Sequence, residues 1–370
     1  MTSDAGRSGL RPPGDSAQQS AVVTRPLWRS GRMWLGIVLS LGSLALAMRG
    51  IDKGEIAATL RTTHLGWLVG AMLVVLISAV AKAVRWRLLF AQGSYQSISP
   101  LPSIGILRLT RIWLAGASLN LAMPAPRSGD LARAYLAGEA GQVSKSFVMG
   151  TIAAEKLLDM VLLAVCFIAL LPLIVLPQEL AARRFPIIGM TTLVMVLVFV
   201  VLWQRRRLLA LAEWLLGKLP ERWGKPLLGS AERAVQGLDA LRSPRLLFWL
   251  TVSSVIIWIL SVSTNYLVFL ALGMRPSWVQ SLFLLVVLQA GVAVPSTPGK
   301  VGVFQVLCRW SLGLFGISAT LGTTYGILLY LAAPVLLMVV GALALGKESW
   351  YLRRLSVSLD SGSVKVEESH

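Results

Sequence analysis

Apolar residues along this chain are gathered into long runs separated by polar stretches. Six runs approach or exceed the roughly 20 residues that a helix needs to cross a bilayer. They cover residues 33–48, 64–81, 147–175, 186–203, 246–272 and 319–345. Because the hydrocarbon core offers the backbone no hydrogen-bond partner, such runs are expected to be helices. They lack the alternating pattern of a membrane β-barrel. The pattern predicts an all-α, polytopic membrane helix bundle with about six full spans.

Two further apolar stretches are broken by proline. Residues 112–123 are too short to cross, end at Pro124, and are followed by an amphipathic piece over 128–136. Residues 278–294 stop at a Pro- and Gly-rich sequence and resume over 302–316. Irregular backbone is tolerated at membrane depth only where it is buried in protein or lines a water-filled cavity. Both stretches are therefore predicted to be re-entrant segments.

The order of these segments suggests an internal repeat. Residues 33–176 read as two spans, a broken segment and a span, and residues 187–345 read the same. The first broken segment would enter from the cytoplasm and the second from outside. Interrupted segments in two opposed halves point to an inverted-repeat transporter with its site near the membrane midplane. The alternative is eight plain helices whose similar hydropathy is coincidental.

Composition and charge agree with a membrane protein and suggest its orientation. Hydrophobic residues make up 55% and charged residues only 14%, with 35 Lys and Arg against 17 Asp and Glu. Most of the excess positive charge falls on one side if both termini are cytoplasmic, so the positive-inside rule predicts N-in and C-in in the cytoplasmic (inner) membrane. Residues 1–32 and 346–370 are expected to be disordered cytoplasmic tails, and 204–245 a charged cytoplasmic helical hairpin.

Few residues suggest metal, cofactor or nucleic-acid chemistry. The two cysteines and two histidines lack any metal-ligand spacing, so neither a metal nor a cofactor is predicted. The basic residues are spread over many loops instead of forming one face, which argues against nucleic-acid binding.

The acids within the apolar runs are Glu155 and Asp159, which lie on one helix face because they are four residues apart. Ionisable residues inside a membrane are candidates for a functional site. Arg127 and Arg133 are the expected counter-ions, whereas Lys156 points elsewhere on the helix. Two interpretations stay open: an ion-pair clamp that holds the first broken segment, or a charged cavity that handles a head group or a proton.

The helix breaks expose backbone polar groups. Helix N-termini after such breaks favour anions, so a phosphate is a natural ligand; the alternative is that the prolines only shape tight turns. Ser296 can satisfy part of the second break. Arg85 and Arg87 flank Trp86 and suggest an interfacial anchor or a phosphate contact. The remaining residues assigned to the breaks are Pro124, Gly129, Pro295, Pro298, Gly299 and Gly302.

Several short motifs resemble those of the lysylphosphatidylglycerol synthase transmembrane region, a family also described as flippase-like membrane proteins. The motifs are RWRLL at 85–89, NLAMP at 120–124, RSGD at 127–130, RAY at 133–135, EKLLD at 155–159, PSTPGKVGVFQ at 295–305 and LFG at 314–316. Their order and spacing match the family over roughly residues 33 to 345. The chain departs from the commonest family pattern at Asp130, Lys156 and Gln305, and Gln305 replaces an acid.

The resemblance implies lipid translocation. Larger relatives join this membrane region to a soluble domain that attaches an amino acid to phosphatidylglycerol, and the membrane region is thought to flip the product. No segment outside the predicted spans is long enough for that domain, so this chain is not expected to be an enzyme. The predicted head-group cavity comprises Arg85, Arg87, Asn120, Arg127, Asp130, Arg133, Glu155, Lys156, Asp159, Ser296 and Gln305.

The predicted function is flippase- or scramblase-like movement of an anionic or aminoacylated phospholipid, or of a lipid-linked intermediate. Two alternatives remain: a non-transporting membrane partner of an envelope-lipid biosynthesis enzyme, and a membrane-embedded transferase acting on a lipid-linked substrate. The expected partners are the membrane lipid itself, a second copy of the chain, and a cytoplasmic biosynthetic enzyme.

Overall fold

A computed structural model describes residues 53–90, 104–123, 127–173, 189, 205–216, 218, 221–292 and 298–348. All regular structure among these residues is helical, as predicted. The elements are α2 (Lys53–Arg61), α3 (Leu65–Phe90), α4 (Ile106–Ala122), α5 (Ser128–Gly141), α6 (Lys145–Leu170), α9 (Arg205–Leu216), α10 (Glu221–Gln236), η3 (Asp239–Arg242), α11 (Pro244–Ala271), α12 (Trp278–Val292), η4 (Pro298–Lys300), α13 (Val303–Gly313), α14 (Ala319–Tyr330) and η5 (Leu331–Val335). The spans predicted at 33–48 and 186–203 lie outside the described residues, apart from Gly189.

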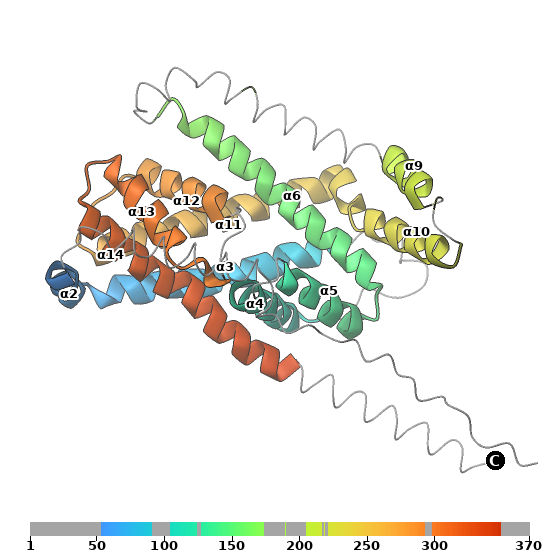
Figure 1. The fold of residues 1–370 in the computed structure, drawn as a ribbon, viewed down its shortest axis with the longest axis horizontal. Helices are drawn as coiled ribbons and strands as arrows, with labels where there is room; N and C mark the ends of the chain where they lie inside the picture. Colours follow the sequence, from blue (N-terminus) through green and yellow to red (C-terminus); the bar gives the residue numbers. More distant parts are fainter. Residues whose placement is uncertain are drawn as a thin grey trace, which may run out of the picture.

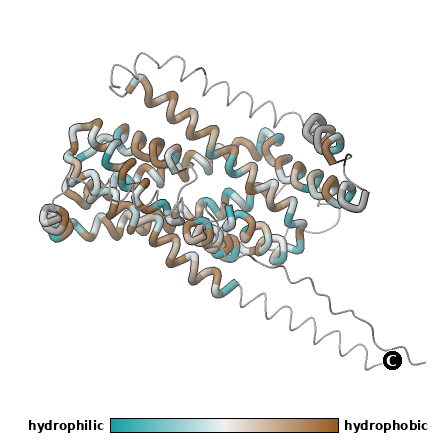
Figure 2. Tube along the Cα trace, viewed as in Figure 1, coloured by the Kyte–Doolittle hydropathy of each residue, from teal (hydrophilic) through white to brown (hydrophobic). Residues whose placement is uncertain are grey.

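Three helices in the described part of the chain are long and apolar enough to cross a membrane. They are α3, α11 and the continuous helix Ala319–Glu348, which contains α14 and η5. Apolar side chains at Leu65, Val69 and Leu73 are exposed along one face of α3, and Figure 2 shows long stretches of hydrophobic residues, coloured brown, along the outer helices. An exposed apolar stripe of this kind marks a surface that contacts lipid or another apolar surface, and together with the three helices of spanning length it indicates a membrane protein.

Helices α3 and α11 form the central antiparallel pair (Figure 1). The N–H of His64, just before α3, donates to the carbonyl of Ala271 at the end of α11 (2.8 Å). The predicted span 64–81 is therefore too short, because α3 continues to Phe90. Its additional turns bury Trp86 and Leu89 in the core, which explains why the helix does not end at its basic residues.

Each predicted broken segment is a two-helix hairpin. Helices α4 and α5 pack together on either side of residues 123–127, and α12 packs on α13 on either side of the second break. Gly129 makes the first hairpin tight, since a Cβ there would lie 1.8 Å from the carbonyl oxygen of Gly116. The helical hairpins are observed, while their re-entry into a membrane stays a prediction.

The two halves repeat one order of described elements. Helix α3 is followed by the α4–α5 hairpin and α6; helix α11 is followed by the α12–α13 hairpin and α14. The two hairpins lie toward opposite ends of the molecule in Figure 1. The order of elements is thus the same in both halves, while their relation as an inverted repeat stays a prediction.

Residues 205–242 form the helices α9 and α10 and the short turn η3. Helix α10 packs on the first turns of α6. The approach is close at Gly150, where a Cβ would lie 1.9 Å from the carbonyl oxygen of Ala234. The predicted helical hairpin is thus fixed to the helix that carries Glu155 and Asp159.

Candidate functional site

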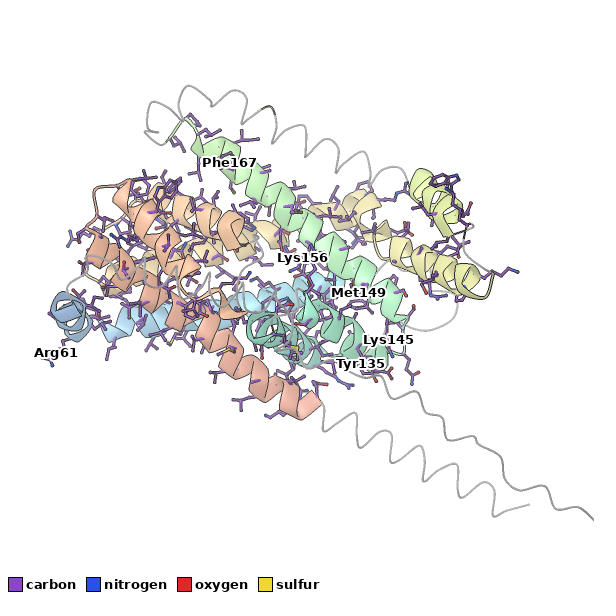
Figure 3. All side chains as sticks on the ribbon, in the orientation of Figure 1. Arg61, Tyr135, Lys145, Met149, Lys156 and Phe167 are labelled. Atoms are coloured by element: carbon purple, nitrogen blue, oxygen red, sulfur yellow. The ribbon has the colours of Figure 1, made fainter. Side chains whose placement is uncertain are left out.

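The two acids of α6 lie at its middle, one turn apart, and differ in exposure. Glu155 is 2% exposed, whereas the Asp159 side chain is 32% exposed. Lys156, between them in sequence, is exposed on another side of the helix, and Figure 3 marks it near the middle of α6. One acid is therefore internal and the other remains partly accessible.

Arg85 of α3 reaches both acids. Its Nη1 lies 2.6 Å from Asp159 Oδ1, and its Nη2 lies 3.2 Å from Asp159 Oδ2 and 3.4 Å from Glu155 Oε1. Nη1 also donates to Ser254 Oγ of α11 (2.9 Å). The side chain is completely buried, so the interpretation of Arg85 as an interfacial anchor is wrong. An interfacial anchor lies at the end of a membrane helix, whereas Arg85 lies within α3 and is buried.

Arg133 of α5 is the second cation on Glu155. Its Nη2 lies 2.6 Å from Glu155 Oε2, and its Nη1 lies 3.8 Å from Asp130 Oδ1. Its guanidinium stacks 4.2 Å from the ring centre of Trp86, which adds a cation–π contribution. The predicted pairing of Arg133 is confirmed for Glu155, whereas Asp159 is paired with Arg85. Glu155 joins α3 to α5 through two arginines.

Arg127 does not take part in this network. It precedes α5 with a left-handed backbone (φ 62°), and its side chain is exposed. Among the described residues Arg127 has no ion pair with Glu155 or Asp159, so that prediction is wrong. Arg85, some seventy positions from Asp159 in sequence, occupies the place that Arg127 was expected to fill.

Two tryptophans complete the cluster. Trp86 Nε1 donates to Thr151 Oγ1 (3.1 Å), and Trp113 Nε1 makes a long contact with Glu155 Oε1 (3.5 Å). Ser254, Trp113 and Thr151 are not among the residues predicted for the site, although each contacts a member of the cluster. Isolated polar residues within apolar helices were the available signal, but many such residues bond only to their own helix.

Polar side chains satisfy the backbone at the first break. Asn120 Oδ1 accepts from the N–H of Gly129 (2.9 Å), and its Nδ2 donates to Asp130 Oδ1 (3.3 Å). Ser128 Oγ donates to the carbonyl of Leu119 (3.1 Å). Asn120 thus caps α5 from the neighbouring helix. Pro124 lies outside the described residues.

The second break uses a similar device. The N–H of Gly302 donates to Gln305 Oε1 (2.7 Å), and the Tyr330 hydroxyl donates to the carbonyl of Gly299. Gly299 and Gly302 have φ of 74° and 86°, which glycine adopts without steric cost. Pro295 and Ser296 lie outside the described residues, and Pro298 begins η4.

These caps change the role expected for the backbone N–H groups at the two breaks. Both amide side chains assigned to the cavity, Asn120 and Gln305, accept hydrogen bonds from the backbone N–H groups that were expected to bind phosphate. A donor already bonded within the protein offers less to an anion. Cationic side chains are consequently better candidates for an anion contact than these two amides.

Lys82 of α3 is not among the residues predicted for the cavity, although it lies beside Trp113 of the cluster. It precedes Arg85 by one turn and its Nζ lies 4.9 Å from the ring centre of Trp113. By contrast, Arg87 is exposed on the opposite side of α3 from the buried Arg85.

The cluster therefore combines a rigid ion-pair core with accessible charge at its edge. Within the described part of the chain, no group of three or more His, Cys, Asp or Glu residues could hold a metal ion. Helix η4 of the second hairpin contacts α4 of the first, so the cluster lies where the two halves meet.

Comparisons with known proteins identify a family over most of the chain. The model described as "Lysylphosphatidylglycerol synthase TM region" matches residues 33–341. This match relates the chain to membrane domains of lipid biosynthesis or flipping. Searches of curated proteins and of solved structures gave no match.

Proposed function

The chain belongs to the lysylphosphatidylglycerol synthase transmembrane region family, and on this premise we propose that it moves an anionic or aminoacylated phospholipid, or a lipid-linked intermediate, across the cytoplasmic membrane. The observation that carries the proposal is the charged cluster of Arg85, Arg133, Glu155 and Asp159. Arg85 lies on α3, which is long and apolar enough to span a membrane, and the other three residues lie on α5 and α6. Charged groups inside a membrane are costly and are typical of transport pathways.

The arrangement of the halves supports the same function. We propose that α3 to α6 and α11 to α14 are inverted repeats whose broken hairpins enter the membrane from opposite sides. In transporters of this kind the substrate site lies between the repeats near the midplane. The contact between η4 and α4 brings the second hairpin to the helix that carries Trp113 and Asn120.

The ion pairs suggest a division of roles between the acids. Glu155 is buried between Arg85 and Arg133, and it acts as a clamp that holds α3, α5 and α6 together. Asp159 is partly exposed and binds one arginine. In this proposal Asp159 is the acid that meets an amine of the head group or exchanges a proton. The lipid gradient, the membrane potential or protons would supply the driving force.

A reconstituted assay tests the proposal. Purified protein in liposomes would be supplied with fluorescent phospholipids that differ in head group, and Asp159→Asn would be compared with wild type and with Lys347→Met, an exposed site on the last helix. We expect head-group-dependent movement that Asp159→Asn slows strongly and Lys347→Met leaves unchanged. No movement above protein-free vesicles for any lipid would contradict translocation.

A second candidate function has a specific observation in its favour. Helices α9 and α10 expose Trp214, Leu215 and Leu227 beside the cations Lys218 and Lys225. In this alternative the chain does not transport but anchors a cytoplasmic lipid-biosynthesis enzyme through this surface. Co-purification of such an enzyme, lost on Trp214→Ala, combined with inactivity of the isolated chain in liposomes, would favour it.

A transferase acting on a lipid-linked substrate has weaker support. Such chemistry needs an activated nucleophile or a metal-bound carboxylate. Glu155 is held by two arginines, and among the described residues no group of three or more His, Cys, Asp or Glu residues could hold a metal ion. We therefore propose that the chain is not itself an enzyme. From the distribution of Lys and Arg along the sequence we propose, separately, that its N-terminus and C-terminus are cytoplasmic.

A further inference from the structure

We propose that the outward face of α9 binds anionic lipids at the membrane surface beside the first turns of α6 and α11. Trp214 and Leu215 at the end of the helix and Lys218 just after it form this face. The inference goes beyond the proposed function, because it concerns how the protein is seated in lipid and not what it moves. It gives to lipid the surface that the alternative function gives to an enzyme.

The last turn of α9 exposes large apolar side chains on one side. Trp214 is 60% exposed and Leu215 is 51% exposed. Lys218 follows Trp214 by four residues and therefore lies on the same side, with its Nζ 3.5 Å from the centre of the Trp214 ring. Leu209 and Leu216, on the other side of the helix, are partly buried, and α9 packs on α10. The outward face is thus directed away from the core of the described protein.

The sequence around this face is basic. Residues 205–218 hold three consecutive arginines and Lys218, against the acid Glu213. Residues 204–245 hold nine Lys and Arg against four Asp and Glu. Basic residues near a bilayer are attracted to anionic head groups. Helices that combine such charge with an exposed apolar side lie in the interface, with that side among the acyl chains. The charge of the segment therefore complements an anionic lipid surface.

The packing of α9 places this face at the level of the head groups. Helix α10 packs on both α9 and the first turns of α6, and η3 joins it to α11, a helix of spanning length. Figure 1 shows α9 and α10 together near the start of α6. The second turn of α11 exposes Phe248 and Trp249. Exposed aromatic residues near the start of a spanning helix are typical of the membrane interface, so α9 is held close to that interface.

The contact between Lys218 and Trp214 matches the chemistry of a phospholipid. Tryptophan has an apolar ring with one polar N–H and is enriched where lipid meets water. The stem of a lysine can lie along apolar surface while its ammonium group stays in water or meets a phosphate. The outward face thus presents a cation and an apolar ring side by side. A phospholipid presents a phosphate directly above its acyl chains, in the same order.

Spin labels on the full chain in lipid nanodiscs test the proposal. Leu215→Cys is the test variant. Glu213→Cys is the matched control, because Glu213 is exposed on the same helix and lies about 160° from Leu215 around its axis. Both variants also carry Cys166→Ala and Cys308→Ala, which remove the two native cysteines. The nanodiscs contain phosphatidylcholine alone or with phosphatidylglycerol, and collisions of each label with oxygen and with a water-soluble nickel chelate are measured.

With phosphatidylglycerol present we expect the Leu215 label to collide mainly with oxygen, which dissolves in lipid, and the Glu213 label mainly with the chelate. Lys218→Met should lower the ratio of lipid-buried to water-exposed Leu215 label by about fivefold, the loss of one lysine at an anionic surface. In phosphatidylcholine alone Lys218→Met should leave this ratio nearly unchanged. In unlabelled wild-type protein, the amides of α9 should exchange hydrogen more slowly with phosphatidylglycerol than without it.

The other outcomes overturn the proposal in distinct ways. If the Leu215 label collides with the chelate as often as the Glu213 label in both kinds of nanodisc, the face is open to water and available to a soluble enzyme. If the Leu215 label is shielded from both reagents and broadened by a second label, the face joins two copies of the chain. Should the cysteine-free variants not fold, equal hydrogen exchange of wild-type α9 in both lipid compositions overturns the proposal. These measurements do not depend on translocation, so failure of the proposed function leaves the lipid contact standing.

Discussion

The two broken hairpins have the same outline but are stabilised by different interactions. The first, α4 and α5, is held by charge: Asp130 and Arg133 lie on α5, and Arg133 pairs with Glu155 of α6. In the second, α12 and α13, Gln305 caps the break and apolar residues such as Leu284 and Leu312 fill the core. The comparison teaches that a repeated architecture need not repeat its chemistry. The first hairpin supplies ion-paired residues of the cluster, and the second hairpin contacts the first through η4 and α4.

The largest effect should come from breaking the clamp of the first hairpin. Glu155→Gln leaves Arg85 and Arg133 buried without one of their carboxylates, and removing one partner of a buried ion pair costs about 3–5 kcal/mol. Unfolding in mixed detergent micelles would measure the change in free energy of unfolding. Glu213→Gln, an exposed acid on α9, is the control. If Glu155→Gln were as stable as wild type, the clamp would have no structural role.

Glycine-to-alanine substitutions should have the next largest effect on stability, and this effect should differ between the two hairpins. Gly129→Ala places a Cβ 1.8 Å from the carbonyl oxygen of Gly116, so α5 must move away from α4 at a cost of about 2–3 kcal/mol. Gly313→Ala in α13 meets no atom within 4 Å and should be neutral or stabilising by less than about 1 kcal/mol. Thermal unfolding of both variants tests this difference. Equal melting temperatures of the two variants would contradict the prediction.

The smallest effects on stability should come from substitutions of the capping residues Asn120 and Gln305. A negative charge at the cap should be tolerated at the second break and unfavourable at the first. Gln305→Glu keeps an oxygen that can accept from the N–H of Gly302, so we expect near wild-type stability, while Gln305→Ala should lose about 1 kcal/mol. Asn120→Asp also keeps an acceptor, but it places a second carboxylate beside Asp130 and removes the Nδ2 donor to it.

Asn120→Asp should consequently be less stable than wild type by about 1 kcal/mol, in contrast to Gln305→Glu. Thermal unfolding at two salt concentrations checks this, because added salt should reduce the penalty of the like-charge contact if the site admits ions. Equal stability of Asn120→Asp and Gln305→Glu would show that the charge of the first hairpin does not control its cap.

The sequence by itself determined the helical membrane class, the position of both breaks and the pair of acids on α6. These features depend on local properties: the length of apolar runs, the conformational limits of proline and glycine, and the helical spacing of Glu155 and Asp159. The boundaries were less well determined. Helix α3 extends to Phe90 because Trp86 and Leu89 find buried partners, and the last helix reaches Glu348, which pairs with Arg108.

Only the tertiary structure decided which charges meet. Arg85 and not Arg127 binds Asp159, because α3 packs beside α6 with that face inward, whereas Arg127 leaves the tip of the first hairpin in a left-handed turn. The assignment of Asn120 and Gln305 as caps, and of Lys82 to the edge of the cluster, has the same origin. Helical periodicity defines the face on which a side chain lies, but the partner on that face depends on how separate helices pack and rotate against each other.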